Sequence, residues 1–598
     1  MNALPNFAPP HIVAETRPDG GVFIRSTDPL RPYAASVIHD FRRGSESHPD
    51  RDLIAERGAD GKWQHMSWGA VRKQVDRVAQ GILDRHLEDQ PVMVLSGNSI
   101  QHLIVMLAAM TVGAPVVSVS VAYSLQSRDH ERLRWMAGFI EPGLVYAETD
   151  AFADAMAVVT AVVPGVTVIG ANFPGTHAAA LEAFGAEPTP EVDRRCTALT
   201  TDTLAKVLFT SGSTGQPKGV ITTHGMLSAN QQQIRQAWPF LAVEPPVLLD
   251  WLPWSHTFGG SHDLYMVLTN GGTLWIDDGR PAPSLIGRTV RNFVDVRPTI
   301  YFGVPAVYSA MLPLLENDDT AADAFLSRLR LGFFAAAALP QDLWDRLERL
   351  ARRHGAKMQM TTSWGLTETS PAATMAHFPI TRSDILGVPL PGMDLLLAPV
   401  GDQLELRVRG PNITPGYYKR PDLTAAAFDE EGFFRTSDAA ALVDAENPDA
   451  GLVFDGRITE NFKLTTGTFV RVGTLRPHLL SVSNGLINDA IICGENHTSV
   501  TAMVWLTAQH AQRVDAQGVP EPALRRELID VLNRLAEAAA GSSQHIERLL
   551  VLTEPPQLDG GELTDKGYIN QRVTRRRRAA QVALLQQEPP PPQVVLRS

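Results

Sequence analysis

The sequence is poor in cysteine, has fewer basic than acidic residues, and contains no long uninterrupted apolar run. Two cysteines in 598 residues exclude a disulfide framework and a four-cysteine zinc site, and they are typical of a protein in a reducing cytosol. Lysine and arginine number 53 against 65 aspartates and glutamates, a net charge of −12. Because phosphate binding needs a basic face, we expect no nucleic-acid partner.

The sequence also shows no pattern typical of a signal peptide or of a membrane-spanning segment. The N-terminus lacks the basic start and apolar core of a signal peptide. Residues 90–126 carry no charged side chain, but Gly97, Gly113 and Pro115 interrupt them, whereas a span needs about 20 continuous apolar residues. The stretch therefore predicts a buried strand, helix and strand of a parallel sheet, and we expect a cytoplasmic protein without a membrane span.

Short β-branched runs alternate with helical patterns through most of the chain, which is typical of α/β layers. Near residue 400 the pattern alternates with period two, as half-exposed antiparallel strands do. Residues 1–30 look like a loosely packed N-terminal arm, and the proline-rich tail at 586–598 is expected to be disordered. Predicted strands are 205–211, 245–253, 273–278 and 298–305, and predicted helices are 340–355 and 521–541.

The strongest motif is LFTSGSTGQPKGV at residues 208–220. Small residues let backbone N–H groups approach an anion, hydroxyls add donors, and a lysine supplies positive charge, so the motif predicts polyphosphate binding. It is not a Walker A loop, because Pro217 precedes the lysine and Gly219 follows it. The candidate ATP-binding residues are Thr210, Ser211, Gly212, Ser213, Thr214, Gly215 and Lys218.

This order of residues resembles the phosphate-binding signature of the adenylate-forming superfamily, which includes acyl-CoA synthetases, luciferases and peptide-synthetase adenylation domains. SWGLTETSP at 363–371 resembles the second nucleotide motif of that superfamily. The resemblance implies that Thr367 contacts the α-phosphate of ATP and that Glu368 holds Mg²⁺. A carboxylate beside phosphate oxygens suits this ion.

Two further segments resemble the ribose site and the hinge. FFRTSDAA at 433–440 implies that Asp438 binds both ribose hydroxyls, although the family often has glycine where this chain has Ser437. FDGRITENFKLTTGTFVRVG at 454–473 implies that Arg457 reaches the ribose or the phosphates, and that Gly467 lines the CoA tunnel. The residue two positions after the arginine is commonly Asp or Lys in the family and is Thr459 here.

GELTDKGYINQR at 561–572 resembles the C-terminal motif that carries the catalytic lysine, here Lys566. Its ammonium is implied to bridge the substrate carboxylate and the α-phosphate, which stabilises charge at the transferring phosphorus. The motif continues into Arg575–Arg578, which we expect to form the solvated face of a last helix.

The substrate side resembles family segments as well. DWLPWSHTFGGSHDLYM at 250–266 resembles the acyl-pocket segment, in which His256 takes the position that gates the carboxylate, and Phe258 and His262 flank the acyl group. FFAAAALP at 333–340 resembles a stretch lining the adenine pocket, which usually contains glycine where this chain has Ala335–Ala338.

Over nearly the whole chain the sequence most resembles bacterial feruloyl-CoA synthetases. The resemblance implies an α/β fold with a large multi-subdomain N-terminal adenylation domain at 31–456 and a small mobile α+β domain at 457–585. It also implies a small carboxylic acid, ATP and coenzyme A as substrates and Mg²⁺ as cofactor. The catalytic residues would be Lys566, Thr367, Glu368 and His256.

The sequence leaves three other functions open. They are a CoA ligase for another aromatic or fatty acid, an enzyme that passes the acyl group to a carrier protein, and a noncatalytic acyl-adenylate-binding protein. No carrier domain with a serine attachment site is evident. A noncatalytic protein is expected to have lost Lys566 or Glu368, and both are present.

Overall fold

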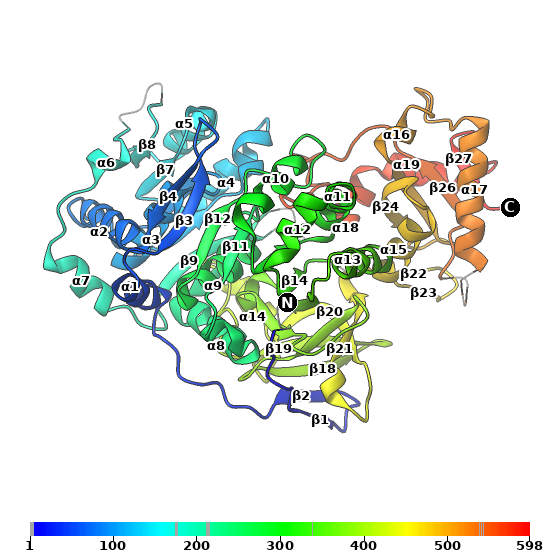
Figure 1. Ribbon diagram of the computed structural model, residues 1–598. Helices are drawn as coiled ribbons and strands as arrows, with labels where there is room; N and C mark the ends of the chain where they lie inside the picture. Colours follow the sequence, from blue (N-terminus) through cyan, green and yellow to red (C-terminus); the bar gives the residue numbers. More distant parts are fainter. Residues whose placement is uncertain are drawn as a thin grey trace.

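The computed structural model describes residues 5–173, 178–210, 216–337, 339–537, 539, 541 and 543–598. Sheets of mixed orientation with helices packed between and around them make up the described chain, which confirms the predicted α/β class (Figure 1). We call residues 5–456 the large domain and residues 457–598 the small domain. The small domain, orange to red, forms the right-hand part of Figure 1.

One sheet of the large domain contains the predicted uncharged stretch. Within the described residues its strand order is β10-β9-β6-β5-β7-β8. The serine hydroxyl of Ser99 caps α3 (Ile100–Val112), Gly113 ends that helix at φ 92°, and the flanking strands β5 and β6 are parallel. No helix in the described part of the chain is long and apolar enough to cross a membrane. The strands are β5 (Val92–Leu95), β6 (Val116–Ser118), β7 (Leu144–Ala147), β8 (Thr167–Gly170), β9 (Leu204–Thr210) and β10 (Lys218–Thr223).

A second sheet of the large domain runs in the order β11-β12-β3-β4 in the described chain, with its two central strands parallel. Its strands are β3 (Asp52–Arg57), β4 (Trp63–Ser67), β11 (Val247–Asp250) and β12 (Thr273–Ile276). Helices of the large domain include α1 (Val37–Ser47), α2 (Trp68–Leu83), α4 (Glu131–Ile140), α5 (Ala153–Val162), α7 (Pro190–Thr197), α8 (His224–Ala237), α9 (Leu264–Asn270), α10 (Ile286–Val296), α11 (Pro305–Glu316), α12 (Asp319–Ser327), α13 (Gln341–Arg353) and α14 (Pro421–Ala427).

The longest sheet joins parallel strands to the antiparallel strands predicted near residue 400. Its order among described residues is β1-β2-β18-β19-β20-β21-β17-β16-β15-β14-β13, in which β13, β14 and β15 are parallel. The strands are β1 (Ile12–Thr16), β2 (Val22–Ser26), β13 (Ile300–Gly303), β14 (Leu331–Phe334), β15 (Gln359–Gly365), β16 (Ala372–Met375), β17 (Ile385–Pro389), β18 (Asp394–Val400), β19 (Gln403–Arg409), β20 (Phe434–Leu442) and β21 (Leu452–Arg457).

The small domain has its own apolar core, built from residues 462–595. Helices α15 (Val472–Val482) and α17 (Pro522–Glu537) pack against each other, and α15 also packs on β24 of the domain's sheet. The sheet consists of β24 (Ile487–Cys493), β25 (Thr501–Leu506), β26 (Arg548–Val551) and β27 (Val594–Leu596), and a short hairpin of β22 (Phe462–Lys463) and β23 (Phe469–Val470) precedes it. Helices α18 (Gln571–Arg577) and α19 (Ala579–Gln586) follow the predicted lysine motif.

Both ends of the chain differ from the sequence-based expectation. Strands β1 and β2 form a hairpin that pairs with β18, and Ile24 is buried, so residues 12–26 of the N-terminal arm form a hairpin that belongs to the sheet. At the other end β27 pairs with β26, and Val594 and Val595 are buried. Proline and glycine residues at these ends are typical of turns, and the short β-branched stretches next to them form the strands.

The last helices also differ from expectation. Arg578 is buried and its guanidinium forms a two-point ion pair with Glu562, and Arg575 donates to the carbonyl of Ile492 at 3.0 Å. Only Arg576 and Arg577 of the run are exposed. The expected solvated face is therefore wrong for half of the arginine run, because the run also passes over the small-domain sheet.

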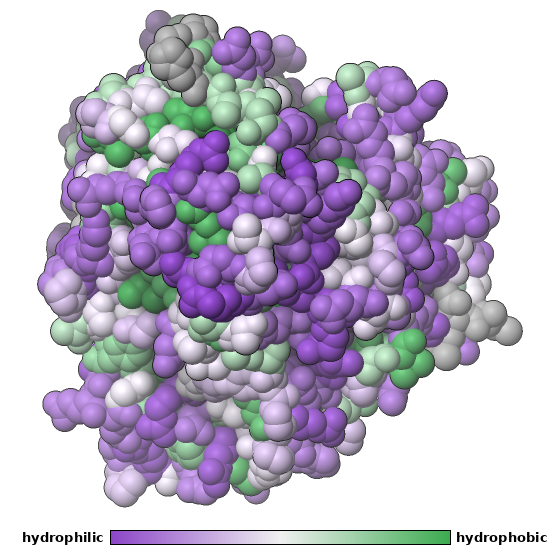
Figure 2. All heavy atoms as spheres, turned by 90° about the vertical axis from the view of Figure 1, so that its left-hand side faces the viewer, coloured by the Kyte–Doolittle hydropathy of each residue, from purple (hydrophilic) through white to green (hydrophobic). Residues whose placement is uncertain are grey.

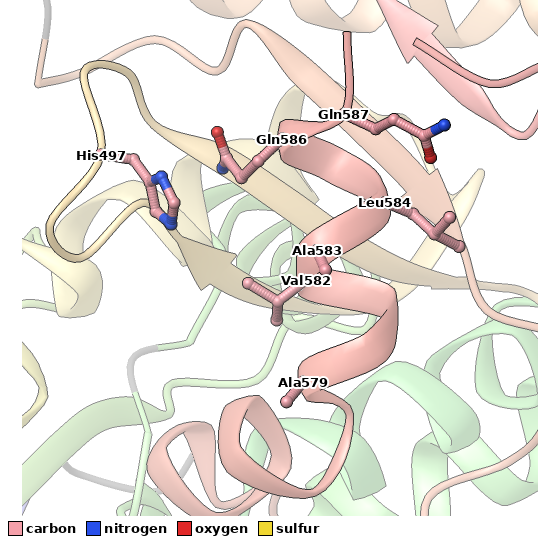
Figure 3. Close-up of a pocket in the computed structure, with 7 residues that line it drawn as sticks. All are labelled: His497, Ala579, Val582, Ala583, Leu584, Gln586 and Gln587. Carbon is pink, nitrogen blue, oxygen red and sulfur yellow. The ribbon is translucent and has the colours of Figure 1, made fainter.

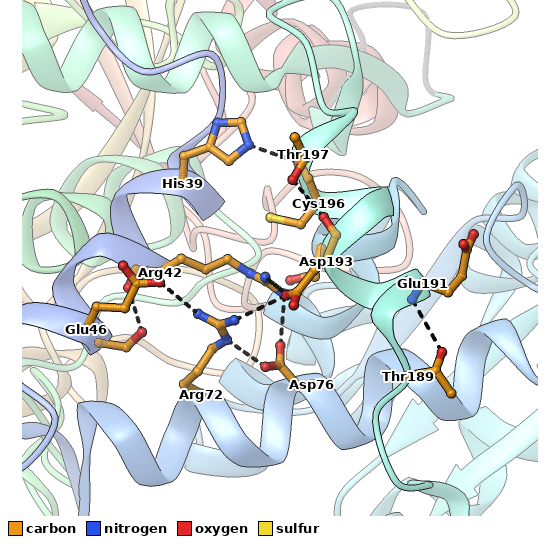
Figure 4. Close-up of polar contacts among 12 residues, drawn as sticks. His39, Arg42, Glu46, Arg72, Asp76, Thr189, Glu191, Asp193, Cys196 and Thr197 are labelled. Carbon is orange, nitrogen blue, oxygen red and sulfur yellow. Dashed lines mark hydrogen bonds and ion pairs between the residues drawn. The ribbon is translucent and has the colours of Figure 1, made fainter.

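Polar contacts tie α1, α2 and α7 together (Figure 4). Asp76 accepts from Arg42 at 3.0 Å and from Arg72 at 2.7 Å, and Asp193 of α7 pairs with the same two arginines. The nearby Cys196 is buried, as is Cys493, so neither thiol is placed for chemistry. The face of the molecule in Figure 2 is largely hydrophilic, in keeping with the composition.

Candidate active site

The described ends of the predicted phosphate loop lie opposite each other. Thr210 ends β9, Lys218 begins β10, and the two residues pair in the antiparallel register. Residues Ser211, Gly212, Ser213, Thr214 and Gly215 lie outside the described residues. The hairpin therefore fixes where the loop begins and ends, at the edge of a sheet whose other strands are largely buried.

The phosphate-side residues gather around Tyr417. The Lys218 ammonium lies 5.2 Å from the centre of the Tyr417 ring, and the Tyr417 hydroxyl donates to Glu368 Oε1 at 2.9 Å. Burial, and next the Glu368 charge, raises the pKa of Tyr417, so its hydroxyl stays protonated and remains a donor. The backbone of Glu368 is fixed by the N–H of Thr414 at 2.8 Å. The structure thus brings Lys218 and Glu368 together, with the buried Thr367 beside them in the chain.

Glu368 is suited to a divalent cation. One carboxylate oxygen is oriented by Tyr417, and the other has no hydrogen-bond partner among the described residues. No cluster of three His, Cys, Asp or Glu side chains that could hold a metal occurs in the described ranges. A single carboxylate fits Mg²⁺, which takes one or two carboxylates together with substrate phosphates.

Asp438, the predicted ribose ligand, is held by two hydrogen bonds. Its side chain on β20 is buried, Oδ2 accepts from the indole N–H of Trp364 at 3.0 Å, and Oδ1 accepts from Arg457 Nε at 2.9 Å. The Asp438 carboxylate raises the pKa of the Arg457 guanidinium, which stays charged. The two predicted residues are therefore direct partners, and the pair orients the carboxylate at the edge of β20 and β21.

Two departures from the family pattern lie at special backbone positions. Ser437 has φ 61° and Ala336 has φ 70°, both in the left-handed region that favours glycine. A side chain there costs about 1 kcal/mol. Part of the Ser437 cost is offset because its N–H donates to Glu405 Oε1 at 3.1 Å. The backbone shape of both segments is thus kept without glycine.

The lysine-bearing loop of the small domain lies against His256 of the large domain. His256 Nε2 is 3.6 Å from Asp565 Oδ2, and Lys566 follows directly. Burial lowers the pKa of His256 to about 4; Asp565 opposes this shift and Lys566 adds to it. The imidazole is therefore neutral at pH 7. Gly467, at φ 83° in the β22–β23 hairpin, has no described heavy atom within 4 Å of the place of a Cβ, so it does not contact these residues.

Two of the three predicted acyl-pocket residues, Phe258 and His262, lie on a single π-helix, η4 (Phe258–Asp263), and His256 precedes it by two positions. Rings of Phe258, Phe302 and Phe333 surround His262, with centroid distances of 5.2–5.8 Å. His262 is buried, its Nδ1 lies 2.7 Å from Asp263 Oδ1, and its Nε2 has no partner among the described residues. Burial lowers the pKa of His262 to about 3, so it too is neutral.

Sequence reasoning missed the residues that shape this π-helix. The Lys206 ammonium on β9 donates to the carbonyl of Gly260 at 2.7 Å, and Gln231 of α8 donates to the carbonyls of Ser261 and His262 at 3.1 Å. Gly260 passes so close to Trp254 that a Cβ would lie 2.2 Å from its carbonyl oxygen. The only signal in the sequence is a lone lysine inside an otherwise apolar strand.

Replacing Lys206 with methionine tests this arrangement. Burial lowers the pKa of Lys206 to about 7, against about 10.4 in an unfolded chain. Between these pH values the unfolded chain binds a proton that the folded chain does not, so wild-type stability rises with pH in that window. We expect the stability of Lys206→Met relative to wild type to fall by roughly 2–3 kcal/mol between pH 6.5 and 9.5.

Urea unfolding followed by tryptophan fluorescence measures the difference at each pH, with the exposed Lys357→Met as the matched control. The KM for the acid should also rise while the KM for ATP is unchanged, because η4 carries the predicted acyl residues. If the difference in unfolding free energy between Lys206→Met and wild type does not change with pH, the pKa of Lys206 is not lowered by burial.

An open hollow in the small domain contains none of the predicted site residues. It is lined by α19 and by His497 from the turn between β24 and β25 (Figure 3). The side chains that it presents are mainly apolar and amide groups, without an acid, a nucleophile or a charged cluster.

Comparison with known proteins adds an independent observation. A family described as "AMP-binding enzyme" matches residues 41–418. The long-chain-fatty-acid–CoA ligase FadD15 of Mycobacterium bovis is 24% identical, covering 90% of this chain and 94% of that protein. The anthranilate–CoA ligase of Pseudomonas aeruginosa is 31% identical, covering 38% of this chain and 43% of that protein.

The fold is shared with solved structures. The adenylation and carrier didomain of carboxylic acid reductase from Segniliparus rugosus, solved with AMP, superimposes with a TM-score of 0.69 at 18% identity. The match covers 94% of this chain and 83% of that one.

Proposed function

Because the chain belongs to the AMP-binding enzymes, we propose that it is an ATP-dependent acid–CoA ligase whose acid is ferulate or a related hydroxycinnamate. The observation that carries the proposal is the position of the Lys566 loop at His256, which joins the predicted catalytic lysine to the predicted acid site. Relatives that are CoA ligases for fatty and aromatic acids support the reaction type. ATP and CoA as substrates and two free cysteines support a cytoplasmic location.

The first half-reaction activates the acid. An oxygen of the acid's carboxylate attacks the α-phosphorus of ATP, the bond to the β-phosphate oxygen breaks, and pyrophosphate leaves. We assign Lys218 and Thr367 to the phosphates, Asp438 and Arg457 to the ribose side, and Lys566 to the charge that builds at the α-phosphate. Mg²⁺ held by Glu368 would neutralise phosphate charge when bound.

The second half-reaction makes the thioester. The CoA thiolate attacks the acyl carbonyl, the bond to the AMP phosphate oxygen breaks, and AMP leaves. Family resemblance implies that the small domain rotates between the two steps, taking Lys566 away and bringing Gly467 to the CoA tunnel. The separate small-domain core and the open surroundings of Gly467 in this arrangement support that proposal.

The aromatic ring cluster supports an aromatic acid. Phe258 is partly exposed beside His256, and behind it His262, Phe302 and Phe333 make a wall of rings. Each contact between an aromatic acyl group and one of these rings stabilises the bound group by about 0.5–1.5 kcal/mol, in addition to the free energy gained by burying it. A fatty acyl group would gain only the free energy of burial.

Pyrophosphate release and CoA-thioester formation should be measured with ferulate, p-coumarate, benzoate and octanoate. We expect thioester from ferulate and p-coumarate, dependent on both ATP and CoA, with lower kcat/KM for the other two acids. Activity with octanoate alone would support an acid–CoA ligase whose substrate is a fatty acid. Release of no pyrophosphate with any of the four would contradict the ferulate assignment and favour a noncatalytic binding protein.

A further inference from the structure

The loop that carries Lys566 contacts the large domain through two residues that precede the predicted motif, Leu558 and Asp559, and through the first residue of that motif, Gly561. Leu558 packs against the apolar cluster beneath α4, and the backbone N–H of Arg128 donates to Asp559 Oδ2 at 3.1 Å. Gly561 lies so close to Arg132 that a Cβ would be 2.8 Å from its guanidinium nitrogen. Leu558, Asp559 and Gly561 therefore lie against the large domain.

Asp565 ends this contact inside the candidate active site. Only 8% of its side chain is exposed, and its carboxylate faces His256 Nε2 at 3.6 Å. Its backbone N–H is hydrogen-bonded to the hydroxyl of Tyr123 on η1 (Ala122–Gln126). Burial, and next the Asp565 charge, raises the pKa of Tyr123 to about 12, so this hydroxyl stays protonated.

The carboxylate of Asp565 is poorly compensated where it lies. The separation of 3.6 Å from His256 is longer than a hydrogen bond, and the imidazole is neutral. A buried carboxylate needs strong partners to offset its lost hydration. The neighbouring groups that suit it are His256 and Lys566, and these are the groups that the proposed reaction assigns to the carboxylate of the acid.

We propose that Asp565 is a positioning residue whose carboxylate occupies the place of the acid's carboxylate beside His256 in the closed, substrate-free enzyme, and that the acid binds by displacing it. This inference rests on the proposed function. The acid and the side chain of Asp565 are both anionic and compete for the place beside the His256 imidazole. Acid binding is thus coupled to a shift of the loop that delivers Lys566.

The test compares Asp565→Asn with wild type in equilibrium binding of ferulate without ATP, by titration calorimetry. Asparagine keeps the size of the side chain and the backbone N–H to Tyr123, and it removes the competing charge. We expect the Kd for ferulate to fall at least about fivefold. Methyl ferulate, which has the same ring but no charge, should bind both proteins equally.

Two further variants sharpen the result. Asp565→Ala should also lower the ferulate Kd, and it replaces Asp565→Asn if that variant does not fold by circular dichroism. Asp530→Asn, an exposed carboxylate on α17, is the matched control and should leave the Kd for both ligands unchanged. A merely structural role for Asp565 would weaken binding of ferulate and methyl ferulate alike.

Unchanged or weaker ferulate binding by Asp565→Asn, in a protein whose wild type makes feruloyl-adenylate, would overturn this inference and leave the proposed function standing. A wild type that forms an adenylate with none of the acids would overturn both. If another acid of the panel is the substrate, that acid and its methyl ester take the place of ferulate and methyl ferulate, with the same expected result.

Discussion

Lys566→Ala is expected to lower ferulate-dependent pyrophosphate release by about 10²–10³-fold. The structure places the loop carrying this lysine against His256, and the proposed mechanism assigns its ammonium to the acid carboxylate and the α-phosphate in the first half-reaction. Removing one preorganised positive group from a site where charge develops has effects of this size. A coupled pyrophosphate assay at saturating ATP and ferulate measures the loss.

The second half-reaction separates this role from general damage. Thioester formation from CoA and preformed feruloyl-adenylate should be nearly unchanged in Lys566→Ala, because the proposed domain rotation takes the loop out of the site before the thiol attacks. Arg526→Ala, on the exposed face of α17, should leave both half-reactions unchanged. Equal losses in the two half-reactions of Lys566→Ala would show that the lysine does not act in adenylation alone.

Glu368→Gln is expected to lower adenylation by about 10²-fold and to raise the Mg²⁺ concentration needed for half-maximal rate. Glutamine can still accept the hydrogen bond from Tyr417, so the side chain should keep its position while losing the charge that holds the cation. Initial rates of pyrophosphate release over a Mg²⁺ titration at fixed ATP measure both effects.

Glu430→Gln changes an exposed carboxylate of the large domain and is the matched control, with an unchanged Mg²⁺ titration expected. If Glu368→Gln reaches the wild-type rate without extra Mg²⁺, Glu368 is not the metal ligand. Its hydrogen bonds with Tyr417 and Thr414 would then indicate a structural role.

Much of the fold follows from patterns that act locally. The uncharged stretch at 90–126 folds as strand, helix and strand because glycine and serine residues divide it into segments of suitable length. Residues 394–409 form antiparallel strands, as their alternating pattern predicts. The chain ends were harder to predict, because the β1–β2 hairpin joins the sheet through β18, and β27 pairs with β26, partners that lie far away in the sequence.

The candidate site was predictable where a short motif carries the chemistry. Asp438 and Arg457, named separately from two motifs, are hydrogen-bonded to each other, and Glu368 lies beside Lys218 through Tyr417. Lys206 could not be predicted, because a lysine in a strand is ordinarily solvated and its role depends on a carbonyl 54 positions away. The position of Asp565 beside His256 could not be predicted for a similar reason, since its partners belong to the other domain.

The separate core of the small domain has a consequence for how the protein denatures. The apolar clusters of the small domain are separate from those of the large domain, and polar bonds such as that from Asn461 to Gln403 Oε1 at 2.8 Å join the two domains beside the Lys566 loop. We expect two cooperative units, so one melting temperature does not describe the chain. A nucleotide bound between Asp438 and the Lys566 loop would contact both units at once. Because such a ligand binds only when both units are folded, it stabilises both of them, and the melting temperatures of the two units become more similar.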